Sequence, residues 1–146
     1  MLDNWKGLAP EKNFKLSEES GREDIKRLFK FYETDLETLP PEAEGGADQV
    51  LSRLLSAIRE GKIELADNDK TGDLEIIQHL KNGDALKFRA LQGKDKTRLE
   101  NAADPVRQMH LLAGILCGLG EDVITKLPIP DLRATEAAMS FLLIMA

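Results

Sequence analysis

The segment from Leu111 to Leu132, which reads LLAGILCGLGEDVITKLPIPDL, constrains the fold more than any other part of the chain. Its apolar residues have helical spacing up to GLG, and glycines commonly end helices. The acidic pair ED follows, and acids favour the first turn of a helix because they complement its dipole. Pro128 closes this short helix, and Asp131 starts another. The segment therefore predicts three consecutive helices.

The residues on either side extend this helical half over 94–146. The stretch KDKTRLENA predicts a polar helix from Lys94 or Asp95, and Asp104-Pro105 is an N-cap followed by a proline at the first helical position. The helix after Pro105 is expected to bury Val106, Met109, Leu112, Ala113, Leu116 and Cys117. The last helix is expected to bury Leu132, Thr135, Met139, Leu142 and Leu143.

A helical hairpin is predicted over 20–60, after a possible polar arm at 1–19. Ile25, Leu28, Phe29, Tyr32 and Leu36 recur at helical spacing, with Ser20 or Gly21 as the cap and Leu39-Pro40-Pro41 as the end. A loop over 41–48 leads to a second helix capped by Asp48. That helix has an apolar stripe and ends at Gly61.

The middle of the chain, 62–91, predicts a small antiparallel sheet. Its extended runs are 62–66, 73–80 and 85–91, and Asn82-Gly83 between two of them indicates a type I′ hairpin. A two-residue loop there pairs Lys81 with Asp84, His79 with Leu86 and Ile77 with Phe88. These elements together predict a single predominantly helical α+β domain over 1–146.

Composition excludes several functional classes. The net charge of -6 disfavours general affinity for nucleic acid, which needs clustered basic residues. No apolar run approaches the roughly 18 residues that a membrane helix needs. The single Cys117 fits a reducing compartment, and the amino terminus does not resemble a secretory signal. The cytoplasm is the expected location.

No residue pattern predicts catalysis, a cofactor or a metal. His79 and His110 lack partners at ligand spacing, so we interpret them as a half-buried strand residue and a helix flank. Cys117 has aliphatic neighbours and is expected to be packed rather than reactive. The run from Asp67 to Asp73 departs from a calcium loop and is expected to be a solvated turn.

Apolar residues near the two ends are the remaining functional lead. Phe14, Phe29, Phe31 and Tyr32 cluster near the amino end, and FLLIMA closes the chain. This terminal run either docks as the last core helix or forms an exposed patch used for binding.

The carboxy-terminal segments resemble a known family. Over roughly 62–146 the chain is similar to tail assembly chaperones of Mu-like and P2-like bacteriophages. The similarity lies in the LCGL of 116–119, the VITKL of 123–127 and the pair Asp131-Leu132. These are packing motifs, so no binding residue is carried over from the family.

The resemblance implies a non-enzymatic chaperone that binds the helical tape measure protein while the tail assembles. Such a client calls for an apolar surface, and Phe29, Tyr32, Leu142 and Leu143 are the candidates for it. Other classes stay open: a minor phage component that forms homo-oligomers, another protein-binding domain, or an enzyme with a pocket near Asp67 and His79. A nucleic-acid regulator is disfavoured by charge.

Overall fold

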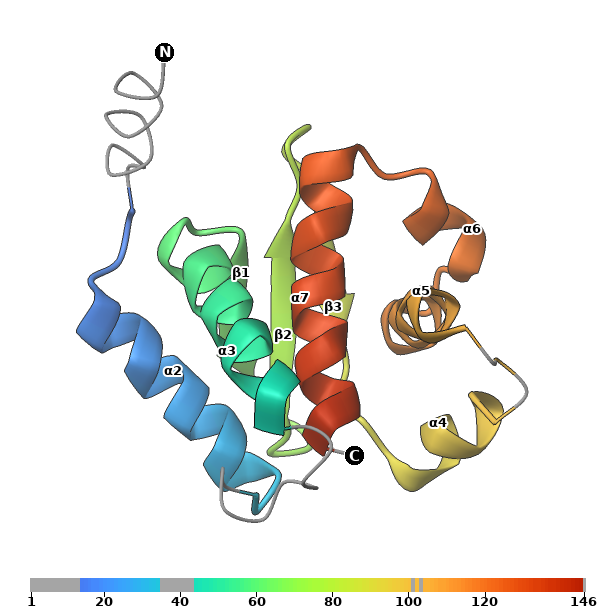
Figure 1. Ribbon diagram of the computed structural model, residues 1–146, viewed down its shortest axis with the longest axis horizontal. Coiled ribbons are helices and arrows are strands. Elements are labelled where there is room, and N and C mark those ends of the chain that lie inside the picture. Colours follow the sequence, from blue (N-terminus) through green and yellow to red (C-terminus); the bar gives the residue numbers. More distant parts are fainter. Residues whose placement is uncertain (1–13, 35–43, 101, 103, 146) are drawn as a thin grey trace.

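The computed structural model describes residues 14–34, 44–100, 102 and 104–145 (Figure 1). This part of the chain confirms the predominantly helical α+β fold, with helices around a three-stranded sheet. No helix within it is long and apolar enough to cross a membrane. The elements are α2 (Glu18–Phe31), α3 (Glu44–Arg59), β1 (Ile63–Asp67), β2 (Leu74–His79), β3 (Ala85–Phe88), α4 (Gly93–Arg98), α5 (Pro105–Cys117), α6 (Glu121–Thr125) and α7 (Ile129–Met145).

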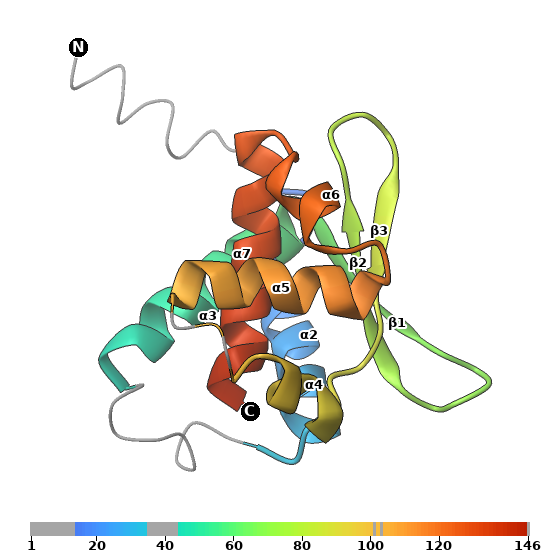
Figure 2. The ribbon, with the colours of Figure 1, turned by 90° about the vertical axis from the view of Figure 1, so that its right-hand side faces the viewer.

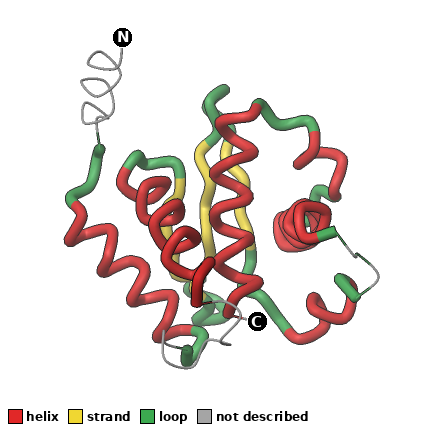
Figure 3. The backbone as a smooth tube through the Cα atoms, viewed as in Figure 1, coloured by secondary structure: helices red, strands yellow, loops and turns green. Residues whose placement is uncertain are grey.

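Helices cover one face of the sheet, and α7 is the central helix (Figures 1 and 2). It contacts α3 on one side and α5 on the other, while α3 also contacts β1 and α5 contacts β3. In Figure 3 the strands lie behind α7, and α2 lies on the outer side of α3. The largest fully buried side chains are Phe88, Phe141, Leu28, Leu54, Ile58, Ile63, Leu112, Ile124, Met139, Leu142, Gln78 and Thr135.

The sheet is an antiparallel meander in the order β1-β2-β3, as predicted. The hairpin between β2 and β3 is also present, but its predicted register is wrong by one residue. Leu86 lies opposite Gln78, not opposite His79. Phe88 is shifted by the same one residue away from Ile77. A slip of one residue turns every side chain to the other face, so the observed register places the buried side chains of both strands on the helix-covered side.

The loop of this hairpin accounts for the shift. A type I′ turn needs positive φ at both central residues, but in Asn82-Gly83 only the glycine has it (95°). The Leu80 amide donates to the Asp84 carbonyl (2.8 Å), replacing the predicted pairing of Lys81 with Asp84. The Lys81 amide instead donates to the Asp131 carboxylate in α7 (3.1 Å). A partner 50 residues away thus holds this loop.

A buried polar cluster joins β2 to α7. Gln78 Nε2 donates to the backbone carbonyl of Asp131 (2.7 Å), and Thr135 Oγ1 donates to Gln78 Oε1 (2.6 Å). Both side chains are fully buried, and buried polar groups are tolerated when they are hydrogen-bonded. The cluster therefore fixes the start of α7 relative to the sheet.

The boundaries of α2 differ from the predicted ones. Ser17, not Ser20 or Gly21, is the N-cap, and its hydroxyl accepts from the Ser20 amide (3.1 Å). The helix ends at Phe31 in a Schellman motif, because Glu33 has positive φ (52°) and the Thr34 amide donates to the Phe29 carbonyl (2.9 Å). The predicted end at Leu39 lies outside the described residues.

Three further helices begin earlier than the sequence predicts. α3 begins at Glu44, so Asp48 lies inside the helix and is not its N-cap. Glycines have low helix propensity, but the burial of Ala47 shows that tertiary packing stabilises this first turn. α7 begins at Ile129, and Asp131 lies in its first turn, because a proline in that turn loses no helical hydrogen bond. α4 begins at Gly93.

The helix boundaries that capping residues and glycines predict are confirmed. The Asp104 carboxylate accepts from the Val106 amide (3.0 Å) to cap α5, and Gly118 ends the helix with positive φ (75°). Gly61 follows α3 with positive φ (79°), and α6 begins at Glu121 as predicted. The predicted buried face of α5 is wrong at Val106, which lies in the first turn and is 47% exposed.

Candidate functional site

The histidines and the cysteine each lie in separate surroundings. His79 is exposed, in contrast to the predicted half-burial, and its Nε2 lies 2.7 Å from a Glu64 carboxylate oxygen. His110 is partly buried, with Nε2 3.0 Å from Glu136. Cys117 is partly buried in α5. Among the described residues, no group of three or more His, Cys, Asp or Glu side chains could hold a metal ion.

The acidic run between β1 and β2 is a turn, as expected. Asn68 Oδ1 accepts from the amides of Lys70 (2.9 Å) and Thr71 (3.3 Å), and Gly72 has positive φ (77°). The Asn68 side chain thus supports the loop through its own backbone.

An open groove between α2 and α3 is the candidate site. Its volume is about 940 Å³, and the helices that form it lie side by side in Figure 1. Four apolar side chains face it, of which Ile25 is nearly covered while Phe29, Leu51 and Leu55 are partly exposed. The other lining residues are Glu18, Arg22, Lys26, Asp48, Ser52, Ser56 and Arg59. The groove therefore combines an apolar interior with a charged rim.

Gly21 allows α2 and α3 to approach closely at one end of this groove. A Cβ at this position would lie 2.7 Å from Leu55 Cδ1 and 3.1 Å from Arg59 Cγ. A larger residue would push against both side chains, so the glycine supports the spacing of the two helices.

Arg59 attaches the chain before α2 to the end of α3. Its carbonyl accepts from the amides of Lys15 (2.6 Å) and Leu16 (3.1 Å), and its Nε donates to the Leu16 carbonyl (3.2 Å). Its guanidinium carbon lies 3.9 Å from the centre of the Phe14 ring, in cation–π range. The chain thus enters α2 at the Glu18–Arg59 end of the groove.

The rim of the groove carries both signs of charge. Arg22 pairs with Glu18 (2.7 Å), and this hydrogen bond lowers the pKa of the Glu18 carboxyl. Lys26 pairs with Glu23 (3.2 Å) on the exposed side of α2. Such exposed pairs add little stability, so the rim is available to rearrange around a partner.

The predicted binding residues do not form one surface. Phe29 lines the groove, and its ring packs edge-on against Phe141 (centroids 5.4 Å apart). The Tyr32 hydroxyl accepts from the Leu91 amide (2.9 Å), and burial raises the pKa of Tyr32. Leu142 is only 1% exposed, which excludes it from the surface of the folded chain, and Leu143 is partly buried. The terminal run is thus largely core.

Sequence reasoning missed Leu51 and Leu55 as groove residues. Both belong to the apolar stripe that the sequence predicts for α3, together with Val50, Leu54 and Ile58. The stripe is wider than the surface that the core covers: Leu54 and Ile58 are fully buried, whereas the two leucines are partly exposed. In the sequence, only an apolar stripe wider than one core-facing side of a helix could have indicated the groove.

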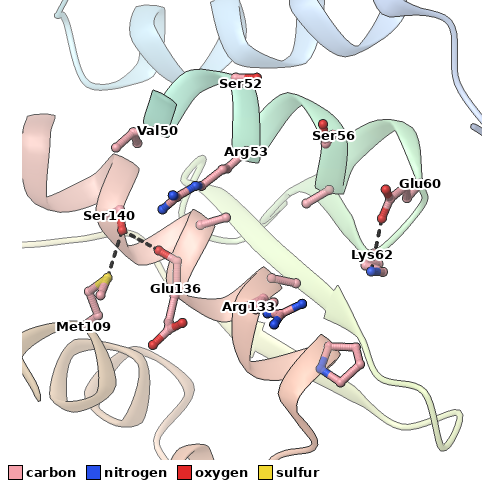
Figure 4. Close-up of a pocket in the computed structure, with 14 residues that line it drawn as sticks. Val50, Ser52, Arg53, Ser56, Glu60, Lys62, Met109, Arg133, Glu136 and Ser140 are labelled. Atoms are coloured by element: carbon pink, nitrogen blue, oxygen red, sulfur yellow. Dashed lines mark hydrogen bonds and ion pairs between the residues drawn. The ribbon is translucent and has the colours of Figure 1, made fainter. Parts of the chain in front are cut away.

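A second groove lies between α3 and α7 (Figure 4). Its volume is about 600 Å³, and small residues such as Ala57 and Ala137 contribute to its lining. Arg53 and Arg133 project from its two sides, and Ser140 Oγ donates to the Glu136 carbonyl (2.6 Å). This groove mixes polar and small apolar side chains and offers less apolar surface to a partner than the α2/α3 groove does.

Comparisons with protein-family models, with curated proteins and with solved structures gave no match to this chain.

Proposed function

We propose that this protein is a non-enzymatic bacteriophage or prophage tail assembly chaperone that binds a helical segment of the tape measure protein. The observation that supports this proposal best is the α2/α3 groove, with its open apolar interior and charged rim. An amphipathic helix places its apolar face in such a groove and leaves its polar face to solvent.

The size of the groove fits one short helical segment. Its α2 side extends from Glu18 to Phe29, and at 1.5 Å per residue this is about 17 Å, or about three helical turns. A client helix of that length presents apolar anchors at positions i, i+3, i+4 and i+7. Phe29, Leu51 and Leu55 offer the matching apolar contacts.

The family resemblance supports the chaperone role but covers roughly 62–146, outside the groove residues. The LCGL motif ends α5, VITKL covers most of α6, and Asp131-Leu132 lies in the first turn of α7. These motifs shape the packing of the helical half, whereas the groove lies on the amino-terminal hairpin. We therefore assign client binding to α2 and α3 and scaffolding to the remainder.

The test is co-expression of this chain with the tape measure protein of the same genome. We expect the client to become soluble and to co-purify with the wild-type chain. Leu51→Glu places a charge in the groove and should abolish co-purification. Leu119→Glu is the matched control, because Leu119 is 57% exposed and lies outside the groove.

Circular dichroism should show that both variants are folded. Equal solubility of the client without this chain would refute the proposal. Equal client binding by both variants would refute the assignment to the groove. Purification of the chain alone as a stable homo-oligomer closed through Leu51 would favour a structural component instead.

A further inference from the structure

The α3/α7 groove carries basic side chains that the fold leaves without an anionic partner. Arg53 projects from α3 and Arg133 from α7, and both residues are exposed (Figure 4). Within the part of the chain that the structure describes, neither guanidinium forms a hydrogen bond or an ion pair. Each wall of the groove therefore offers an arginine that can bind an anion.

The acidic side chains of the groove do not neutralise these two arginines. Three basic and two acidic residues line it. Of the two acids, Glu60 pairs with Lys62 (3.1 Å), and a Glu136 carboxylate oxygen lies 3.0 Å from His110 Nε2 in α5. The whole chain has a net charge of -6, so the surplus of positive charge is a local property of this groove. Charge complementarity therefore favours an acidic ligand.

Small side chains keep the space between the two helices open. Ala57 of α3 and Ala134 and Ala137 of α7 line the groove and are at most 6% exposed. The remaining volume, about 600 Å³, is a half-open groove and not an enclosed cavity. Pockets for small molecules cover most of the ligand, whereas a half-open groove with alanines in its lining lets a peptide backbone come close to both helices.

The two arginines lie at different places along the groove. In Figure 4, Arg53 is nearer the end where Val50 and Ser140 lie, and Arg133 is nearer the end where Lys62 lies. A ligand that contacts both arginines along the groove carries two anionic groups. In an extended peptide, side chains i and i+2 point to the same side and lie about 7 Å apart. A Glu-Ala-Glu sequence thus presents two carboxylates on one side.

We propose that the α3/α7 groove binds an acidic segment of a partner protein in an extended conformation, with one carboxylate on Arg53 and another on Arg133. Arginine suits this role because its planar guanidinium pairs with a carboxylate through two parallel hydrogen bonds. Neither arginine lines the α2/α3 groove, so this site does not depend on the function proposed for that groove.

The test is fluorescence anisotropy of a fluorescein-labelled, amidated Gly-Glu-Ala-Glu-Gly peptide with the full-length protein at low ionic strength. We expect saturable binding that weakens as salt is added. Arg53→Glu and Arg133→Glu should each weaken binding by about tenfold or more. Arg98→Glu is the matched control, because Arg98 is exposed in α4 and lies outside the groove. It should leave the dissociation constant nearly unchanged.

A reversal of charge on both sides distinguishes direct contact from a change in the fold. The double variant Arg53→Glu/Arg133→Glu should lose the Glu-Ala-Glu peptide and bind an amidated Gly-Lys-Ala-Lys-Gly peptide instead. Both arginines are exposed, so circular dichroism should show that every variant is folded.

Several outcomes would overturn the proposal. The first is no saturable binding of the Glu-Ala-Glu peptide, and the second is equal binding of a Gly-Gln-Ala-Gln-Gly peptide, which has no carboxylate side chain. A loss caused equally by Arg98→Glu would show attraction to surface charge in general. Binding of inorganic phosphate or of an oligothymidine that depends on Arg53 and Arg133, without peptide binding, would assign the groove to phosphates.

Discussion

Asp95 shows how one buried charge stabilises a local structure. Its carboxylate accepts two hydrogen bonds from the Arg89 guanidinium (2.7 and 2.8 Å) and one from the Gln92 amide (2.9 Å). The hydrogen bond from Arg89, followed by that from the Gln92 amide, holds the pKa of Asp95 below its usual range despite burial. The same pair raises the pKa of Arg89. Asp95 thus ties the start of α4 to the end of the sheet.

Asp95→Asn should lower the free energy of unfolding by about 2–3 kcal/mol at neutral pH, because it leaves Arg89 without its anion. The pKa of Asp95 is lower in the folded state than its unfolded value of about 3.9. Its contribution is therefore complete above that value and is lost as pH falls through the folded pKa. Urea denaturation from neutral to acidic pH should show the variant and the wild type converging below about pH 4.

The exposed Asp69→Asn is the control and should change stability little at any of these pH values. A difference between Asp95→Asn and the wild type that stays constant down to the acidic limit would contradict the role assigned to the Asp95 charge.

At the scale of elements, Gly114 sets how closely α5 and α6 pack. A Cβ at this position would lie 2.5 Å from the Gly120 carbonyl carbon and 2.6 Å from the Glu121 nitrogen. Both are backbone atoms, which cannot move aside as a flexible side chain can. The connection between the helices folds tightly over Gly114, whose carbonyl accepts from the Gly118 amide (3.1 Å) and the Gly120 amide (3.2 Å).

Gly114→Ala should therefore destabilise the protein by about 1–3 kcal/mol, although alanine favours helices. Gly93→Ala is the matched control, because a Cβ at Gly93 meets nothing within 4 Å. It should be neutral or stabilise by up to about 1 kcal/mol. Thermal unfolding of both variants checks this, and a rise in Tm for Gly114→Ala would show that the two helices separate easily.

At the scale of the whole molecule, α7 connects the two halves of the fold. It contacts α3 from the amino-terminal hairpin and α5 from the helical half. Phe141 and Leu142 are at most 2% exposed, and Phe141 also touches Phe29 in α2. The end of α7 therefore belongs to a core shared by distant parts of the chain.

Leu142→Ala should lower the free energy of unfolding by about 2–5 kcal/mol because it leaves a cavity in this core. Leu143→Ala, at a partly buried neighbour, should cost clearly less. The midpoint from circular dichroism should coincide with that from thiol labelling of Cys117 in α5, as expected when the helices unfold together. Labelling of Cys117 well before the loss of helix would show that α5 separates from α7.

Prediction from the sequence succeeded where short-range chemistry decides. The Asp104 cap and the left-handed Gly118 depend on residues within one helical turn, so their identities suffice. The groove was only partly predictable: Phe29 was identified, but Leu51 and Leu55 were not separated from the core stripe of α3. Their exposure depends on how far α2 covers α3, which no local pattern encodes.

The sequence by itself determined the order of elements, the antiparallel meander and the helix boundaries marked by Gly61, Asp104, Gly118 and Glu121, because periodicity and capping act between neighbouring residues. Tertiary structure alone decided the register of the β2/β3 hairpin and the burial of Leu142. The register depends on the hydrogen bond from the Lys81 amide to the Asp131 carboxylate, 50 residues along the chain. The burial of Leu142 depends on which helix faces pack together, because an apolar stripe can pack equally well against the core or against a partner.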